Sequence, residues 1–400
     1  MSSLRYVLEM LQFEQEQHIP LIRLLGFAGI FSDTDLGTVM TNDDAEKILK
    51  SNLACTNDPL IIAEEFCRLC NLGFKKLRNG GERQQMPKLE AKRPQDFEII
   101  KQAIESLGVT VERKFPSNLE GATFIVFGAS QNSLILRLKF LNNQLNKKQG
   151  EIGTLYLLGG DRKLWPQYSG QDEGVKKSLS EIKFSYEDST ALLLENLNKD
   201  KSDKELKSSA EFQIKINTLI EEYIKNKSPN ITEIRKRICQ YFESAGYIYP
   251  TESDLERHLA KIILKIDDSK IKIIEGEIEE IINRPTTETT LKKLADELTQ
   301  DSDLRERLLI FISNAPHMIK QEAEIKKALQ GQGLKFSISG PSCDVTPDLA
   351  HMIESVLGTI NTRSQQIATA TRQQPSTPQS LTGIKPPIPL QTPPNRGDQK

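Results

Sequence analysis

The chain has 400 residues, of which 37% are hydrophobic, and 53 basic residues nearly balance 55 acidic ones to give a net charge of −2. This balance excludes an overall field that would draw the protein to nucleic acid or to an anionic membrane surface. The length allows two or three compact units, and the modest apolar fraction predicts some exposed helix or disordered tail.

The five cysteines are odd in number and scattered, which is typical of a reducing compartment. We expect a soluble, cytoplasmic protein without a membrane span, because the apolar stretch over 19–31 is too short to cross a bilayer and contains Arg23. Cys67 and Cys70 form a C-x-x-C spacing within an amphipathic helical pattern. We interpret them as two packed helix thiols, since free cysteine behaves as a small apolar residue.

Residues 1–120 form a predicted helical module. Apolar residues recur there at three- and four-residue spacing over 4–13, 43–54, 58–77 and 94–108. This pattern predicts helices that pack together or contact a partner, and it suggests no chemistry.

Short apolar runs alternate with helical periods from residue 121 onward, except in a charged stretch over 166–246. The alternation predicts an α/β fold with a doubly wound, mostly parallel sheet, divided between 121–165 and 247–345. Its expected strands are 122–128, 153–160, 269–277, 307–314 and 334–340.

Two further segments differ in composition from the sheet domain. Residues 166–246 are rich in charged helical patterns and are interpreted as a helical insertion. Residues 360–400 are rich in Pro, Gln, Ser and Thr, and we expect a disordered tail, because such a segment buries too little apolar surface to offset its ordering entropy. Either segment is a candidate contact for a protein partner, the Pro-rich tail through polyproline II.

Glycines and polar side chains follow the predicted strands, where open α/β sheets bind their ligands. Backbone amides at a helix start attract anions, and arginine offers several donors. The sequence therefore predicts a site for a small anionic ligand at this edge of the sheet. Its candidate ligand-binding residues are Gly128, Ser130, Arg137, Gly159, Gly160, Arg162, Thr287 and Asn314.

Each of these residues also has a purely structural interpretation. The glycines suit tight turns, the threonine run over 286–290 suits helix capping, and Arg137 suits an ion pair with a surface carboxylate. Taken together at one edge of one sheet, they favour a binding site over these separate explanations.

The same residues, in the same order, resemble those of the YdcF-like (SanA/ElyC-like) family of bacterial proteins. The resemblance covers about 140 residues in short blocks, with Gly128, Arg137, Glu252, Thr287 and His317 at positions that match the family pattern. It implies a Rossmann-like domain and, in at least some members, a nucleotide-like ligand such as S-adenosylmethionine. The chain departs from the family pattern at Leu158, Thr290 and Lys320.

The sequence leaves open whether the protein is an enzyme. Glu252 and His317 are the acid or base candidates at the predicted edge, and no motif indicates a metal. The main hypothesis is a domain that binds a nucleotide or S-adenosylmethionine. The alternative is a non-catalytic scaffold that engages partners through the insertion and the tail.

Overall fold

The computed structural model describes most of the two folded units of the chain. Arg162, most of the 166–246 insertion and residues 374–400 lie outside the described residues. Those described are 8–9, 11–31, 40–53, 58–78, 88–160, 164, 167–169, 183–185, 214, 218, 240, 243–244, 248, 250–277, 286–300, 306–346 and 348–373.

The centre of the molecule is a five-stranded sheet in which all neighbouring strands are parallel. Their order across the sheet is β5-β2-β1-β6-β7, so the direction of winding reverses between β1 and β6. Each strand falls within a range predicted from the sequence, and the doubly wound α/β fold is confirmed. The strands are β1 (Thr123–Phe127), β2 (Leu155–Leu158), β5 (Ile271–Ile273), β6 (Leu308–Ile312) and β7 (Lys335–Ser339).

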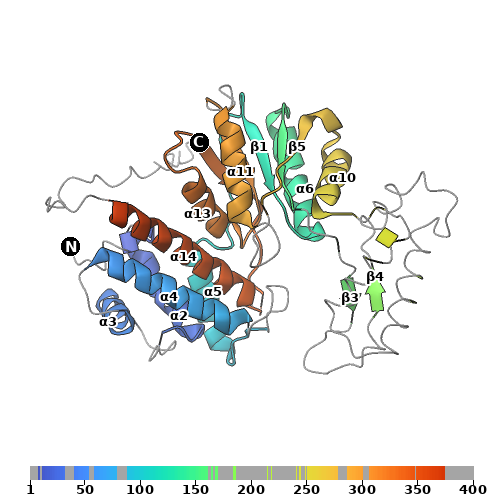
Figure 1. Ribbon diagram of the computed structural model, residues 1–400. Helices are drawn as coiled ribbons and strands as arrows, with labels where there is room; N and C mark the ends of the chain where they lie inside the picture. The colour runs from blue at the N-terminus through green and yellow to red at the C-terminus, as the bar shows by residue number, and fades with distance from the viewer. Residues whose placement is uncertain are drawn as a thin grey trace, which may run out of the picture.

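Two pairs of helices cover the sheet (Figure 1). One face packs against α6 (Gln131–Lys148) and α10 (Glu252–Leu264), and the other against α11 (Thr287–Gln300) and α13 (Met318–Ala328). Successive residues of β1 show why its sequence is continuously apolar. Phe124 and Val126 belong to the core under α6 and α10, whereas Ile125 and Phe127 belong to the opposite core, since adjacent strand residues point to opposite faces.

A separate helical unit carries the third core of the molecule. Figure 1 shows α14 lying beside α4, although the two helices are far apart in the sequence. The helices of this unit are α2 (His18–Phe27), α3 (Asn42–Asn52), α4 (Pro59–Arg78), α5 (Pro94–Ser106) and α14 (Ala350–Gln373). Cys67 and Cys70 both lie on α4, and Cys70 is buried in this core.

The predicted start of the tail at residue 360 is wrong, because α14 continues to Gln373. Ile360, Ile367 and Ala368 are 0%, 4% and 8% exposed and form an apolar stripe at a spacing of seven and eight residues. That helical period is present in a composition otherwise typical of a tail, and burial of the stripe stabilises the helix.

The insertion also differs from the all-helical prediction. Residues 183–185, within a segment expected to be helical, form β4 (Lys183–Ser185). This strand pairs antiparallel with β3 (Gln167–Ser169) as a separate two-stranded sheet. At these residues strand pairing therefore decides the local structure, although the sequence around them has a helical period.

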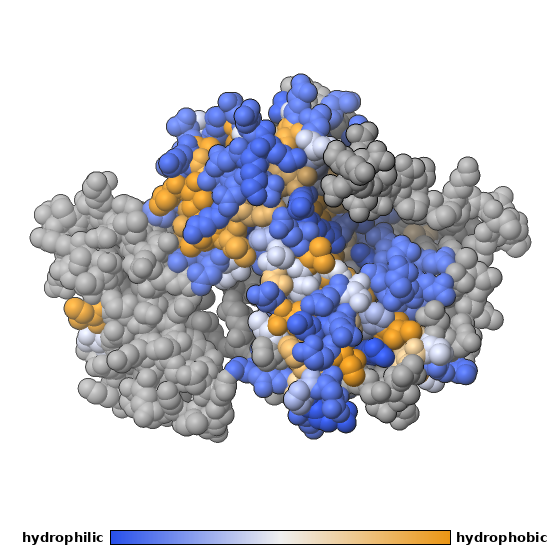
Figure 2. Space-filling model, turned by 180° about the vertical axis from the view of Figure 1, so that it is seen from behind, coloured by the Kyte–Doolittle hydropathy of each residue, from blue (hydrophilic) through white to orange (hydrophobic). Residues whose placement is uncertain are grey.

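The surface of the α/β unit carries some exposed apolar side chains. Leu136 on α6 is 43% exposed and Ile262 on α10 is 53% exposed, and Figure 2 shows apolar residues gathered on the face that carries these helices. Among the described helices, none is long and apolar enough to cross a bilayer.

Candidate functional site at the carboxyl ends of the strands

The loops after β1 and β2 and the start of α10 form one corner at the carboxyl edge of the sheet. The Gly128 amide donates to the Leu158 carbonyl at 2.9 Å, so the strand pairing continues past β1. The Ser253 hydroxyl donates to the Gly160 carbonyl at 3.2 Å and ties α10 to the loop after β2. The glycines predicted after β1 and β2 therefore lie side by side.

Gly128 and Gly159 are both required by close packing. A Cβ atom at residue 128 would lie 2.5 Å from the Leu158 carbonyl oxygen and 2.5 Å from Oε1 of Glu256. A Cβ atom at residue 159 would lie 2.6 Å from Oγ of Ser253 and 2.8 Å from Oε2 of Glu256. The sequence analysis predicted both glycines as ligand-binding residues. In the structure, the group that approaches is the carboxyl of Glu256.

Glu256 is the most unusual side chain of this corner. It is 1% exposed, and neither carboxyl oxygen has a hydrogen-bond partner in the described part of the chain. Burial raises the pKa of Glu256 well above its ordinary value, the charge of Glu252 raises it further, and Arg137 opposes the shift. A carboxyl whose pKa is raised holds its proton more readily than an ordinary glutamate, and in the protonated form it can donate one hydrogen bond and accept others.

The sequence reasoning missed Glu256 and named Glu252, one helical turn earlier. A signal was present, because α10 buries Ser253, Leu255, Leu259 and Ala260, and Glu256 falls on that same buried face. Carboxylates are almost never fully buried unless they are paired, so a glutamate on the apolar face of an amphipathic helix indicates a special role.

Arg137 differs from the expected ligand donor. It is 1% exposed, and its Nη1 donates to the carbonyls of Phe127 and Gly128 at 2.7 and 2.9 Å. Its Nε donates to Oδ1 of Asn314 at 2.7 Å. Arg137 and Asn314 therefore join the end of β1 to the end of β6, across the point where the winding of the sheet reverses.

The start of α6 lies next to this corner and is open to solvent. Ser130 occupies the N-cap position and is exposed, and its side chain makes no capping hydrogen bond to the helix backbone. Its hydroxyl lies 3.3 Å from the hydroxyl of Ser133. The first backbone amides of α6 therefore have no capping side chain from Ser130. They lie at the positive end of the helix dipole, where helix starts bind anions.

The remaining predicted residues lie at other points along the edge. Glu252 is the half-buried first residue of α10. Thr287 begins α11, where Thr286 and Thr289 cap each other through backbone-to-hydroxyl hydrogen bonds of 3.0 and 3.2 Å. The ring of His317 reaches α14, with Nδ1 lying 3.5 Å from the hydroxyl of Ser355. The structure thus joins Gly128, Arg137, Gly159, Gly160 and Asn314 through shared contacts, and His317 contacts a different unit.

The described residues contain no group of three or more His, Cys, Asp or Glu side chains that could hold a metal ion. Comparisons of the chain with family models, with curated proteins and with solved structures found no match.

Proposed function

We propose that the corner formed by β1, β2 and α10 binds a small nucleoside-type ligand, such as a nucleotide or S-adenosylmethionine. The observation that carries this proposal is Glu256, a fully buried carboxyl whose two oxygens lack hydrogen-bond partners among the described residues. Leaving a buried polar group unsatisfied costs about 1–3 kcal/mol. Strained or costly groups of this kind are typical of binding and catalytic sites.

The two parts of the corner suit the two parts of such a ligand. Sheets with the strand order seen here bind dinucleotides with the phosphates at the first helix start, and an acidic residue binds the ribose hydroxyls. In this chain the amides at the start of α6 would bind the anionic group. Glu256, which packs against Gly159 at the end of β2, would bind the ribose hydroxyls.

Two other residues predicted from the sequence lie where they could contribute to the proposed site. Ser130 lies beside the proposed anion position, and Glu252 lies one turn before Glu256, where it could act as a base beside a neutral acid. The resemblance to YdcF-like proteins implies the same ligand class. We also propose a cytoplasmic location, on the basis of the scattered, odd number of cysteines.

Isothermal titration of the full chain tests the proposal. The probes are ATP, S-adenosylmethionine, adenosine and inorganic tripolyphosphate. Glu256→Met, which removes both carboxyl oxygens, should weaken binding of ATP and adenosine by about tenfold, the value of one hydrogen bond of about 1.4 kcal/mol. It should leave tripolyphosphate binding unchanged. Glu105→Met is the matched control, a substitution of an exposed glutamate on α5 that should not alter any affinity.

Two outcomes would contradict the proposal. ATP binding that is unchanged by Glu256→Met would show that the carboxyl is not part of the site. Absence of binding by every probe, together with capture of a protein partner through 166–246 or 374–400, would favour the scaffold alternative.

A further inference from the structure

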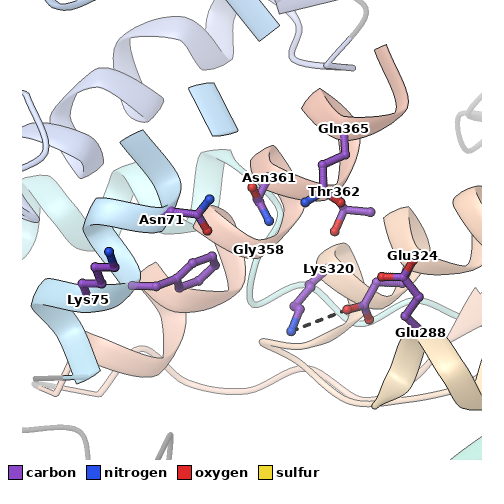
Figure 3. Close-up of a pocket in the computed structure, with 10 residues that line it drawn as sticks. Asn71, Lys75, Glu288, Lys320, Glu324, Gly358, Asn361, Thr362 and Gln365 are labelled. Atoms are coloured by element: carbon purple, nitrogen blue, oxygen red, sulfur yellow. Dashed lines mark ion pairs between the residues drawn. The ribbon is translucent and has the colours of Figure 1, made fainter. Parts of the chain in front are cut away.

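A groove between the two units is separate from the corner at Glu256. Figure 3 shows side chains of α4, α11, α13 and α14 directed into it. Its volume is about 720 Å³, within the usual range of small-molecule sites, about 300–1,000 Å³. Because helices of both units line the groove, a ligand here would contact both of them.

The charged groups of this groove are largely neutralised within the protein. Nζ of Lys320 lies 3.5 Å from Oε1 of Glu324, and Lys327 contacts Oε1 of Glu288 at 2.7 Å. Lys320 is fixed along its length as well, since a Cβ at residue 358 would lie 2.6 Å from its Cδ atom. Both carboxylates are matched by a lysine, and Lys75 is the remaining charged side chain of the lining, so the groove does not favour a ligand of large net charge.

The uncharged lining is unusually rich in side-chain amides. Asn71, Asn361 and Gln365 contribute three carboxamides, and Thr362 adds a hydroxyl. The oxygen of Gln365 also accepts from Nζ of Lys327 at 3.2 Å, which leaves its amide nitrogen to donate. The Oδ1 atom of Asn361 is buried and lacks a hydrogen-bond partner in the described part of the chain. A carboxamide presents a donor and an acceptor in one plane, which matches adjacent hydroxyls that each donate and accept.

We propose that this groove binds a neutral, polyhydroxylated ligand of sugar size. The carboxamides bind its hydroxyls, and the half-buried ring of Phe74, which also lines the groove, covers its apolar face. The proposal is independent of the nucleoside site, because it uses none of the residues at the ends of β1 and β2.

Ligand-observed NMR and titration calorimetry on the full chain test this inference. The neutral probes are glucose, sucrose and trehalose at about 10 mM, a concentration that detects dissociation constants in the millimolar range. At least one should bind, and Asn361→Ala and Gln365→Ala should each weaken that binding by about tenfold. The control is Asn143→Ala, which removes an exposed carboxamide of α6 and should bind like the wild type.

Three results would overturn the inference. The first is that none of the neutral probes binds. The second is that glutamate or glucose 6-phosphate binds more tightly than every neutral probe, which would assign the groove to charged ligands. The third is that Gln365→Ala, at a half-buried position that tolerates truncation, binds a sugar as the wild type does.

Discussion

Two glutamates, the half-buried Glu322 and the fully buried Glu256, show how the two faces of the α/β unit differ. Glu322 on α13 contacts Arg113 at 2.5 Å and Lys326 at 3.0 Å. Burial opposes its ionisation, but the charges and hydrogen bonds of Arg113 and Lys326 outweigh burial and lower the pKa of Glu322 to about 2. Glu256 on α10 is more deeply buried, has no hydrogen bond among the described residues, and has its pKa raised.

Glu322 therefore stabilises the fold through its ion pairs, whereas the burial of Glu256 destabilises it. The backbone of Arg113 pairs with that of Gly340 after β7, and its side chain forms an ion pair with Glu322. The ion pair therefore connects α13 to the segment around Arg113 that precedes β1. Glu256 makes no hydrogen bond or ion pair among the described residues, and its burial costs free energy. A group that is retained at such a cost is the better candidate for function.

Arg137→Met should have the largest effect, a loss of about 3–5 kcal/mol in the free energy of unfolding. It leaves the carbonyls of Phe127 and Gly128 and the amide oxygen of Asn314 without a donor, at about 1–3 kcal/mol for each buried group. Urea unfolding measures the change. A loss below about 1 kcal/mol would show that Arg137 does not hold the sheet edge together.

Glu322→Gln should cost about 3 kcal/mol at pH 7, since a pKa lowered from 4.5 to about 2 corresponds to that free energy. The folded pKa is depressed, so the contribution is present above pH 4.5 and is lost as the pH falls from 4.5 toward 2. Unfolding measured across this range should therefore converge for wild type and variant at low pH. Parallel curves would contradict the ion-pair interpretation.

Glu256→Met should do the opposite and stabilise the protein by about 1–2 kcal/mol at neutral pH, because it removes an unpaired buried carboxyl while keeping its volume. The folded pKa is raised, so the native state retains its proton more strongly than the unfolded state. The part of this cost that comes from ionisation is therefore absent below pH 4.5, grows as the pH rises above 4.5 and is complete once the pH exceeds the folded pKa. The gain from Glu256→Met should grow in the same direction, and a destabilised variant would show that Glu256 has a structural partner.

His317→Ala should have the smallest effect, within about 1 kcal/mol in stability, and should change ATP affinity by less than about twofold. Its ring faces Ser355 of α14 rather than the corner at Glu256. Calorimetric titration measures the affinity. A tenfold loss would restore His317 to the site predicted from the sequence.

The sheet could be predicted because each strand is a short apolar run bounded by glycine or polar residues, and local pattern specifies such elements. The roles of the individual residues at the site could not be predicted from the sequence, because they depend on contacts between segments that are far apart in the chain. Arg137 is directed at Asn314, which lies 177 residues later in the chain, and no local pattern carries that information. Glu256 was detectable in principle, as a charge on an apolar helix face, but only by asking which face of α10 is buried.

The sequence analysis placed the last turns of α14 in the tail for a related reason. Its composition resembles that of a tail, whereas its apolar residues keep a helical period that gains its meaning from the helices it packs against, α4 and α13. Sequence composition records what a segment contains, and packing decides whether a sparse stripe of apolar residues is enough to order it.

The pairing of α14 with α4 also sets an order of events during synthesis. The ribosome makes α4 early and α14 only after every strand of the sheet, and at about 5–20 residues per second the delay is roughly ten seconds or more. Until then the apolar face of α4 lacks the helix that covers it in the finished protein. We therefore expect the helical unit to need chaperones that bind exposed apolar surface while the chain is being made. The strands of the sheet are all synthesised before α14, so the sheet can form before the helical unit is complete.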